Sequence, residues 1–370
     1  MKTQSYIRGL DGLRCIGTLI ILFYHIERAK SLFDLPSFSK HQQTGVGQSV
    51  MTLFFVLSGF LIFYLLLNEK AASGTVSVKS FYKRRIARIW PVYYVLVFAS
   101  VFVFEYHKEF FSSQSLHHTK DYMDVVILYV LHMPNFHIFF TSSLLAIGHF
   151  WSLGVEEQFY AIAPWIIKKT KNYVRVFVII IVAKMGFKLL VACSYRFLPL
   201  SAEAVEFLKD LERFLYKLRF EAFALGGIAA YLFVEQKQNV LNFIYRPSVQ
   251  WINLLLFILT VPLGTRSESI QILYALNFAI MILNIVGNKR SVFLPDYKLT
   301  NYIGKISYGV YMYQIPVIYL TVNVLKSYYS PANSVIWNIA YYSATVCFPI
   351  IIASVSYELM EKRIIRWSHR

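Results

Sequence analysis

Ten apolar stretches, each near the length that crosses a lipid bilayer, dominate this sequence of 370 residues. A membrane-spanning helix needs about 20 mostly apolar residues. The stretches are 10–29, 49–67, 89–106, 149–167, 174–193, 214–234, 247–264, 269–287, 302–325 and 336–356. Apolar side chains make up 57% of the chain, and a soluble core of this size could not bury that much apolar surface. The sequence therefore predicts an all-α polytopic membrane bundle of about ten helices, with residues 1–370 forming one domain.

An eleventh apolar stretch, 122–147, is interrupted by two histidines, a proline and an asparagine between positions 132 and 137. If this stretch crossed the membrane once, the lysine-rich loop at 168–171 would lie outside the cell. If it is re-entrant, or a hairpin that stays on the outer side, the same loop lies inside. Because Lys and Arg collect in cytoplasmic loops, we favour the second topology, with both termini cytoplasmic.

The charge balance is strongly basic, with 37 Lys and Arg against 20 Asp and Glu and a net charge of +17. In a soluble protein this excess would suggest nucleic acid as a partner. In a membrane protein it is typical of cytoplasmic loops that face anionic lipid, so we expect the bilayer and no nucleic acid. The three cysteines, Cys15, Cys193 and Cys347, lie inside apolar stretches and offer no zinc or disulfide spacing, so no metal is expected.

Two polar residues of the first stretch, Arg14 and His25, are candidates for function because charge at membrane depth is costly. Their separation corresponds to about three helical turns and ~16 Å, so they share one stripe of the helix. Taken alone, Arg14 could be a side chain that extends to the lipid phosphates at the membrane surface. Taken alone, His25 could be a histidine that forms a hydrogen bond within the bundle. Their shared face favours a joint functional role.

The densest polar cluster in any stretch lies at 149–160. On helical spacing His149, Ser152, Glu156 and Tyr160 form one stripe, and in the favoured topology this helix starts at the outer face. A carboxylate near an imidazole fixes the tautomer of the ring and makes it a general base. We therefore expect Glu156 to orient His25, although a purely structural His–Glu pair between two helices is the alternative.

A cationic face is predicted at Arg84, Arg85 and Arg88, which have i, i+3 and i, i+4 spacings at the end of the loop that precedes the third stretch. The simple interpretation is the ordinary basic flank of a cytoplasmic loop. The functional interpretation is a phosphate clamp, because arginine forms bidentate contacts with phosphate.

Taken together, these segments resemble the acyltransferase-3 family, integral membrane enzymes that move acyl groups from acyl-coenzyme A to sugar hydroxyls. The matching segments, in the family's order, are Arg8-Gly-Leu-Asp-Gly-Leu-Arg14 followed by ten residues and His25, Phe54-Phe-Val-Leu-Ser-Gly-Phe-Leu61, Arg84-Arg-Ile-Ala-Arg88 with Pro91, the 149–160 segment and Ile303-Gly-Lys-Ile-Ser-Tyr308.

The resemblance implies that Arg14 and His25 are the family's essential pair and that Arg85 and Arg88 form its Arg-x-x-Arg motif. It also implies ten helices, a bacterial cell membrane, an acetyl group as the default acyl group, and acyl-coenzyme A as co-substrate with no permanently bound cofactor. Two motifs depart from the family pattern. Gln314 stands where Tyr-x-x-Tyr-x-x-His-x-Pro has its histidine, and the closing Glu-Lys-Pro is Glu361-Lys362-Arg363.

A mechanism follows from the resemblance and the spacing. The three arginines would hold the nucleotide phosphates at the cytoplasmic mouth, and the pantetheine arm would run past Arg14 to bring the thioester near His25. His25 would then either deprotonate the acceptor hydroxyl or take the acyl group itself, with Arg14 anchoring the donor or offsetting oxyanion charge. The acceptor would be a cell-surface glycan or a lipid-linked sugar.

Four further residues are expected to support the site or contact substrate: His149, Trp151, Ser152 and Ser58. A transporter or flippase of a glycan-related substrate is the main alternative, because intramembrane His, Lys and Glu also build substrate paths. We find no paired broken helices in matching halves, which many secondary transporters have. A glycan polymerase or ligase is a third class, and it would ignore coenzyme A.

Overall fold

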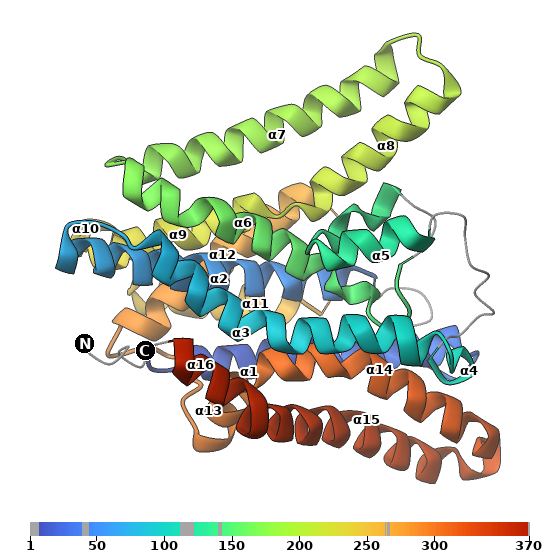
Figure 1. Ribbon diagram of the computed structural model, residues 1–370. Helices are drawn as coiled ribbons and strands as arrows, with labels where there is room; N and C mark the ends of the chain where they lie inside the picture. The colour runs from blue at the N-terminus through green and yellow to red at the C-terminus, as the bar shows by residue number, and fades with distance from the viewer. Residues whose placement is uncertain are drawn as a thin grey trace. The chain divides into compact units, whose positions relative to one another are not determined.

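The computed structural model describes residues 7–38, 44–111, 122–139, 143–262, 264 and 267–368. Every regular element in these ranges is helical (Figure 1). Five of the described helices are long and apolar enough to cross a membrane, or six if the pair Gln238–Ile244 and Pro247–Thr260, bent by 61°, is one span. The five are Gly45–Ser73, Val78–Phe104, Tyr173–Phe197, Ser269–Gly287 and Pro331–Ser368. An all-α membrane protein is thus confirmed, and the count of ten spans and the placement of the termini stay predictions.

Residue contacts divide the chain into two compact units. Unit 1 contains the described residues up to Leu13, together with Thr44–Val78 and Ser152–Tyr297. Unit 2 contains the described parts of Arg14–Gln43, Lys79–Trp151 and Lys298–Arg370. The single domain predicted over 1–370 stays a prediction.

Unit 1 is built around the crossing of two helices whose backbones touch. Its helices are α2 (Thr44–Ser73), α6 (Trp151–Lys169), α7 (Tyr173–Phe197), α8 (Ala202–Lys217), α9 (Phe220–Val234), α10 (Gln238–Ile244), α11 (Pro247–Thr260) and α12 (Glu268–Gly287). A Cβ atom on Gly59 of α2 would lie 2.2 Å from the carbonyl oxygen of Phe223, and one on Gly226 of α9 would lie 2.2 Å from that of Val56. Small residues let membrane helices approach this closely, which explains the glycine of the Ser-Gly-Phe-Leu motif.

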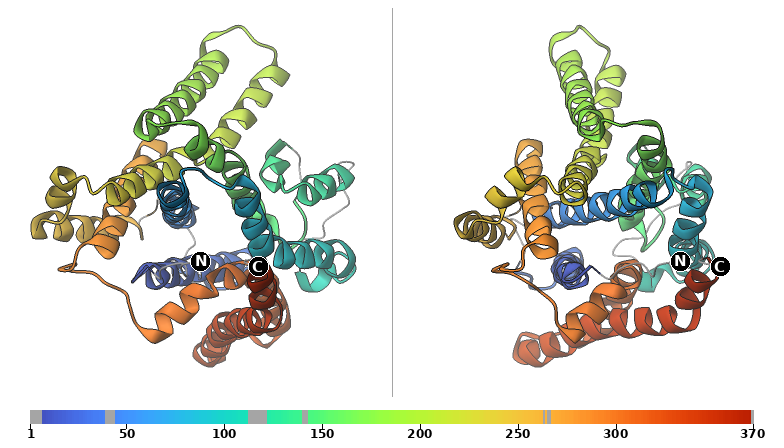
Figure 2. Two further views of the ribbon diagram at one scale, coloured as in Figure 1. Left: turned by 60° about the vertical axis from the view of Figure 1, so that its left-hand side comes forward. Right: turned by 90° about the vertical axis from the view of Figure 1, so that its left-hand side faces the viewer.

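The hairpin of α7 and α8 is the part of unit 1 where the predicted spans and the structure differ. The stretch 214–234, predicted as one span, is broken at Leu218 and Arg219, where ψ is 81° and 39°. Charged residues recur along α8, so it is an amphipathic helix packed on α7, whereas α9 is apolar after Glu221 in its first turn. Figure 2 shows α7 and α8 side by side in both views.

Unit 2 has a core formed where α1, α14 and α15 meet. Its helices are α1 (Leu10–Leu32), α3 (Val78–Ala99), α4 (Lys108–Phe111), α5 (Tyr122–Val130), α13 (Lys298–Lys305), α14 (Ser307–Leu325), α15 (Ser334–Ser356) and α16 (Lys362–Ser368). Six short helical segments complete the described elements: η1 (Ser100–Phe104), η2 (Pro134–Phe139), η3 (Gly148–Phe150), η4 (Lys326–Tyr328), η5 (Pro331–Asn333) and η6 (Tyr357–Glu361). The core contains Leu22 and Ile26 of α1, Ile318 and Val322 of α14, and Tyr341 of α15, all at most 2% exposed.

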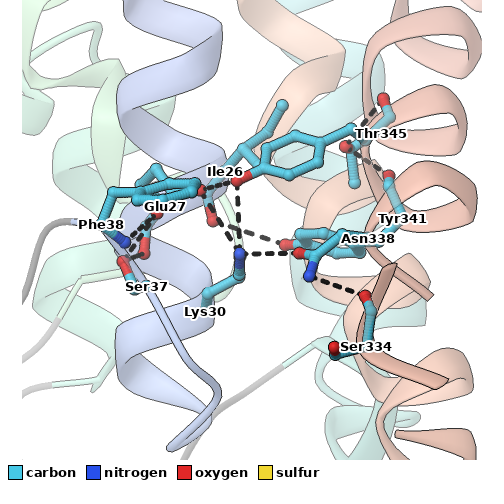
Figure 3. A network of polar contacts seen from close by, with 10 residues as sticks. Ile26, Glu27, Lys30, Ser37, Phe38, Ser334, Asn338, Tyr341 and Thr345 are labelled. Atoms are coloured by element: carbon cyan, nitrogen blue, oxygen red, sulfur yellow. Dashed lines mark hydrogen bonds and ion pairs between the residues drawn. The ribbon is translucent and has the colours of Figure 1, made fainter. Parts of the chain in front are cut away.

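A buried ion pair ties the end of α1 to α15 (Figure 3). Lys30 Nζ lies 3.6 Å from Glu27 Oε1 and donates to Asn338 Oδ1 at 2.9 Å and to the Tyr342 hydroxyl at 3.2 Å. The other carboxylate oxygen of Glu27 accepts from Ser37 Oγ and from the next backbone N–H, both at 2.8 Å, and Tyr342 donates to Oε1. Both charges of this Glu27–Lys30 network therefore have hydrogen-bond partners. The bonds to Glu27 attach the segment at Ser37 and Phe38 to α1, and those of Lys30 attach α1 to α15.

The interrupted stretch 122–147 forms no continuous helix in its described residues. α5 spans nine residues, a turn follows at 131–133 and η2 begins at Pro134. His132 has φ of 58° in this turn, which lies against the aromatic rings of Trp90 and Tyr93 of α3. Residues 140–142 lie outside the described residues. The choice between a re-entrant segment and an outer hairpin stays a prediction.

Candidate active site

The first helix of unit 2 carries two of the residues singled out by the sequence. α1 is one continuous helix from Leu10 to Leu32, so Arg14 and His25 keep the spacing of about three turns that an unbroken helix imposes. Both side chains are half-buried. The stripe predicted for them is therefore compatible with the backbone, and their chemical roles stay predictions.

His25 lies beside His149, with 6.1 Å between the ring centroids and the rings nearly edge to face. His149 belongs to η3, the short 3₁₀ segment that runs directly into α6. Its Nε2 lies 2.9 Å from the backbone oxygen of Tyr311 on α14. Because a carbonyl oxygen only accepts, Nε2 must carry the proton. The Tyr311 hydroxyl donates in return to the backbone oxygen of His149 at 2.7 Å, so Tyr311 bonds to both the ring and the backbone of His149.

Gln314, which stands where the family pattern has histidine, completes this cluster. Its side chain is fully buried and lies within hydrogen-bonding reach of the His25 ring. Nε2 of Gln314 donates to the backbone oxygen of Tyr311 at 3.1 Å, and this hydrogen bond fixes the orientation of the side-chain amide. Within the described residues, neither Gln314 Oε1 nor His25 Nδ1 has a hydrogen-bond partner. Nδ1 of His25 is therefore available for a hydrogen bond with a ligand.

Glu156 belongs to unit 1, where it joins α2 and α6. Its Oε1 accepts from Ser58 Oγ at 2.5 Å and from the Tyr160 hydroxyl. Ser152, one turn earlier on α6, is 2% exposed, and Trp151 is half-buried at the first position of that helix. The contact of Ser58 with Glu156 connects two motifs that the sequence analysis had treated separately. The predicted pairing of Glu156 with His25 would join the two units and stays a prediction.

The predicted phosphate clamp lies in the first turns of α3, where Arg84, Arg85 and Arg88 are all half-buried. The guanidinium of Arg85 lies 5.8 Å from the ring of Phe81, a cation–π distance. Arg88 interacts electrostatically with the buried carboxylate of Glu361.

Glu361 is the functional candidate that the sequence analysis did not single out. It ends η6, a π-helical turn between α15 and α16, and accepts from Ser356 Oγ at 2.9 Å. π-turns within long helices are frequent at functional sites. Arg363 stands where the family pattern has proline, and the chain here stays helical to Ser368 because arginine leaves the backbone N–H in place.

Comparison with known proteins gives these motifs a family. The family model described as "Acyltransferase domain" matches residues 7–354. A Staphylococcus aureus protein named a putative O-acetyltransferase is 35% identical over 170 residues, which are 45% of this chain and 25% of that protein. No solved structure matches the chain.

Two relatives align with most of the chain. The protein YrhL of Bacillus subtilis, named a putative peptidoglycan O-acetyltransferase, is 25% identical over 98% of this chain and 56% of its own length. The peptidoglycan O-acetyltransferase OatA of Listeria monocytogenes is 25% identical over 88% of this chain and 51% of its own length. The chain thus spans about half the length of each of these two relatives. Because the family model covers nearly all of the sequence, the chain belongs to the acyltransferase-3 family.

Proposed function

We propose that this protein is a membrane O-acyltransferase that moves an acyl group, acetyl by default, from cytoplasmic acyl-coenzyme A to a hydroxyl of a cell-surface glycan. The family membership supports acyl transfer, and the names of two relatives suggest peptidoglycan or its lipid-linked precursor as the acceptor. The location would be a bacterial cell membrane.

The observation that carries this proposal is the set of polar side chains around His25. The ring lies on an apolar helix, next to a second imidazole and a buried amide, and its Nδ1 has no hydrogen-bond partner in the described residues. A polar group left unpaired in such surroundings is costly, so it calls for a functional reason. An acceptor hydroxyl or a thioester carbonyl supplies one.

Two routes use His25 differently. In the first, a ring nitrogen takes the hydroxyl proton, the acceptor oxygen bonds to the thioester carbonyl carbon, and the carbon–sulfur bond breaks. The departing thiolate then takes the proton back from the imidazolium. In the second, one His25 nitrogen bonds to the thioester carbonyl carbon, the carbon–sulfur bond breaks, and the departing thiolate takes the N–H proton of the ring, which leaves an acyl-imidazole. The acceptor hydroxyl then takes the acyl group, and its proton returns to the ring.

The remaining residues have supporting roles in this proposal. Arg84, Arg85 and Arg88 bind the donor's phosphates, and the buried carboxylate of Glu361 attracts the Arg88 guanidinium electrostatically. Arg14 stabilises the oxyanion or anchors the donor. Glu156 positions the reacting groups through α6.

The central test replaces His25 with alanine and measures acylation of surface glycans by mass spectrometry. General base or nucleophilic catalysis contributes about 10²–10⁴-fold, so His25→Ala should lose at least about a hundredfold. The matched control is His107→Ala, a substitution of an exposed histidine that pairs with Glu109. Normal acylation by a well-expressed, membrane-inserted His25→Ala protein would refute the assignment.

Two further variants test the supporting roles. Glu156→Gln should abolish transfer without loss of the folded protein, because the amide keeps the shape and loses the charge. Joint neutralisation of Arg85 and Arg88 should chiefly raise the apparent KM for acyl-coenzyme A. A change confined to the acceptor's apparent KM would show that the donor phosphates bind elsewhere.

Mass spectrometry also separates the two routes. Incubation with acetyl-coenzyme A and no acceptor should add an acetyl group to the peptide that contains His25 if the ring is the nucleophile. If His25 is only a base, coenzyme A release should require the acceptor and the peptide should stay unmodified.

A further inference from the structure

Arg219 in unit 1 is a buried cation that the proposed reaction does not use. It is 0% exposed, and in the described part of the chain its Nε, Nη1 and Nη2 atoms all lack a hydrogen-bond partner. A guanidinium carries five N–H donors in a planar fork. Because unpaired buried donors are costly, a charged group with none of its donors satisfied requires an explanation.

The neighbours of Arg219 do not supply the missing acceptors. Nη1 lies 3.7 Å from Glu221 Oε1, beyond hydrogen-bonding distance, while the other oxygen of that carboxylate lies 3.1 Å from Lys184 Nζ. The guanidinium lies 4.2 Å from the ring of Tyr216, whose hydroxyl also lacks a partner among the described residues. Arg219 and Tyr216 thus present donors in one place, and we name them, with Lys184 and Glu221, the Arg219 site.

The backbone around Arg219 is unusual for a membrane protein. The chain leaves the helical conformation at Leu218 and Arg219, between α8 and α9. Irregular backbone at membrane depth is tolerated where it is buried in protein or lines a cavity, and broken helices often mark substrate sites.

The Arg219 site continues into a polar seam that reaches the edge of the unit. Lys188 Nζ of α7 lies 5.3 Å from the ring of Tyr216 and 4.0 Å from Glu212 Oε1 of α8. The side chains of Lys188 and Glu212 are 17% and 27% exposed, whereas those of Arg219 and Glu221 are 1% and 2% exposed. An anionic group entering between α7 and α8 would therefore meet a lysine first and the arginine last.

We propose that the Arg219 site binds the phosphate group of a lipid. Arginine suits phosphate because its fork forms two parallel hydrogen bonds with the oxygens. α7 also exposes apolar residues, with Val182, Leu189 and Leu190 between 61% and 65% exposed, and Leu189 directly follows Lys188, so an apolar surface suited to lipid adjoins the seam. The ligand is thus an amphiphile, and a phospholipid headgroup and a polyprenyl phosphate share the required chemistry. This binding does not depend on the proposed acyl transfer.

Native mass spectrometry of the purified full chain tests the proposal, with lipid retention as the readout. The probes are phosphatidylglycerol, a polyprenyl phosphate, diacylglycerol without phosphate, and inorganic phosphate. We expect either phosphate lipid to be retained and to raise the Tm, and diacylglycerol to do neither. Preference between the first two probes identifies the source. Equal retention of diacylglycerol, or binding of inorganic phosphate with no gain from a lipid tail, would overturn the proposal.

Matched variants assign the binding to Arg219. Arg219→Gln should reduce retention of the phosphate lipids about tenfold or more, since hydrogen bonds between charged groups are lost. Arg213→Gln, on the exposed face of α8 where Arg213 pairs with Asp210, should leave retention unchanged. Equal losses in both variants would mean that the lipid binds through surface charge alone.

Lys188→Gln keeps the test decisive if Arg219→Gln does not fold. Its side chain is partly exposed, so folding should persist while retention falls several-fold. Retention equal to that of the unmodified protein would contradict entry along the seam.

Discussion

The Glu27–Lys30 network and the Arg219 site are both buried ion-pair clusters on helices of this protein, yet their hydrogen bonding differs. In the first, Lys30 donates to Asn338 and Tyr342, and Glu27 accepts from a hydroxyl and a backbone N–H. In the second, no guanidinium nitrogen of Arg219 has a hydrogen-bond partner in the described residues. A satisfied network fixes structure, whereas an unsatisfied one leaves donors for a ligand.

The largest difference should appear when the lysine of the satisfied network is removed. Lys30→Ala leaves the Glu27 carboxylate buried without its cation, and breaking one partner of such a pair costs about 3–5 kcal/mol. The measurement is the free energy of unfolding of the purified protein in detergent. Lys298→Ala, at an exposed lysine of α13, is the control and should stay within about 0.5 kcal/mol. A loss below about 1 kcal/mol for Lys30→Ala would show that the network is not a structural tie.

A double substitution sharpens this result. Glu27→Leu combined with Lys30→Met removes both charges and keeps apolar volume, and such replacements of buried pairs are often neutral or stabilising. We expect the double variant to be more stable than Lys30→Ala alone. If it is less stable, packing and the bonds to Ser37, and not the charge pair, dominate the contribution.

The next effect concerns a single hydroxyl. Tyr342 donates to Glu27 and accepts from Lys30, so Tyr342→Phe should lower the free energy of unfolding by about 1.5–3 kcal/mol, the range for hydrogen bonds to charged groups. The control is Tyr328→Phe, at a tyrosine that is 69% exposed. Equal stability of the two variants would contradict the prediction.

Removing the charge of Arg219 should lower the free energy of unfolding much less than removing the charge of Lys30. In lipid-free detergent, Arg219→Gln should change the free energy of unfolding by less than about 1 kcal/mol, because the guanidinium has no hydrogen bond to any described residue and Glu221 keeps Lys184 at 3.1 Å. Thermal unfolding without added lipid measures this. A loss near that of Lys30→Ala would mean that Arg219 is a structural cation.

The sequence predicted the all-α membrane class because the length and apolarity of a helix are local properties. It also selected His25 and His149, which lie beside each other in the structure. It did not predict the break at Leu218 and Arg219, since the apolar run of α9 continues into the apolar residues of α8.

Contacts between residues far apart in the chain could not be predicted from the sequence. Ser58 and Glu156 are 98 residues apart, and no local pattern indicates their hydrogen bond. The Glu27–Lys30 pair left a weak signal, because its i, i+3 spacing places two opposite charges on one face of α1. Its partners Asn338 and Tyr342 come from α15, and only tertiary packing brings them together.

The smallest predicted effect uses the same substitution as at Tyr342. The hydroxyl of Tyr216 has no hydrogen-bond partner in the part of the chain that the structure describes, and its ring faces Arg219 at 4.2 Å. Phenylalanine keeps the ring and the cation–π contact, so Tyr216→Phe should change the free energy of unfolding by less than about 0.5 kcal/mol without lipid. With phosphatidylglycerol present, the variant should gain less Tm than the unmodified protein, because one donor to the phosphate is gone. If Tyr216→Phe costs as much as Tyr342→Phe in lipid-free detergent, its hydroxyl has a protein partner, and the two clusters do not differ in the way that makes one of them a binding site.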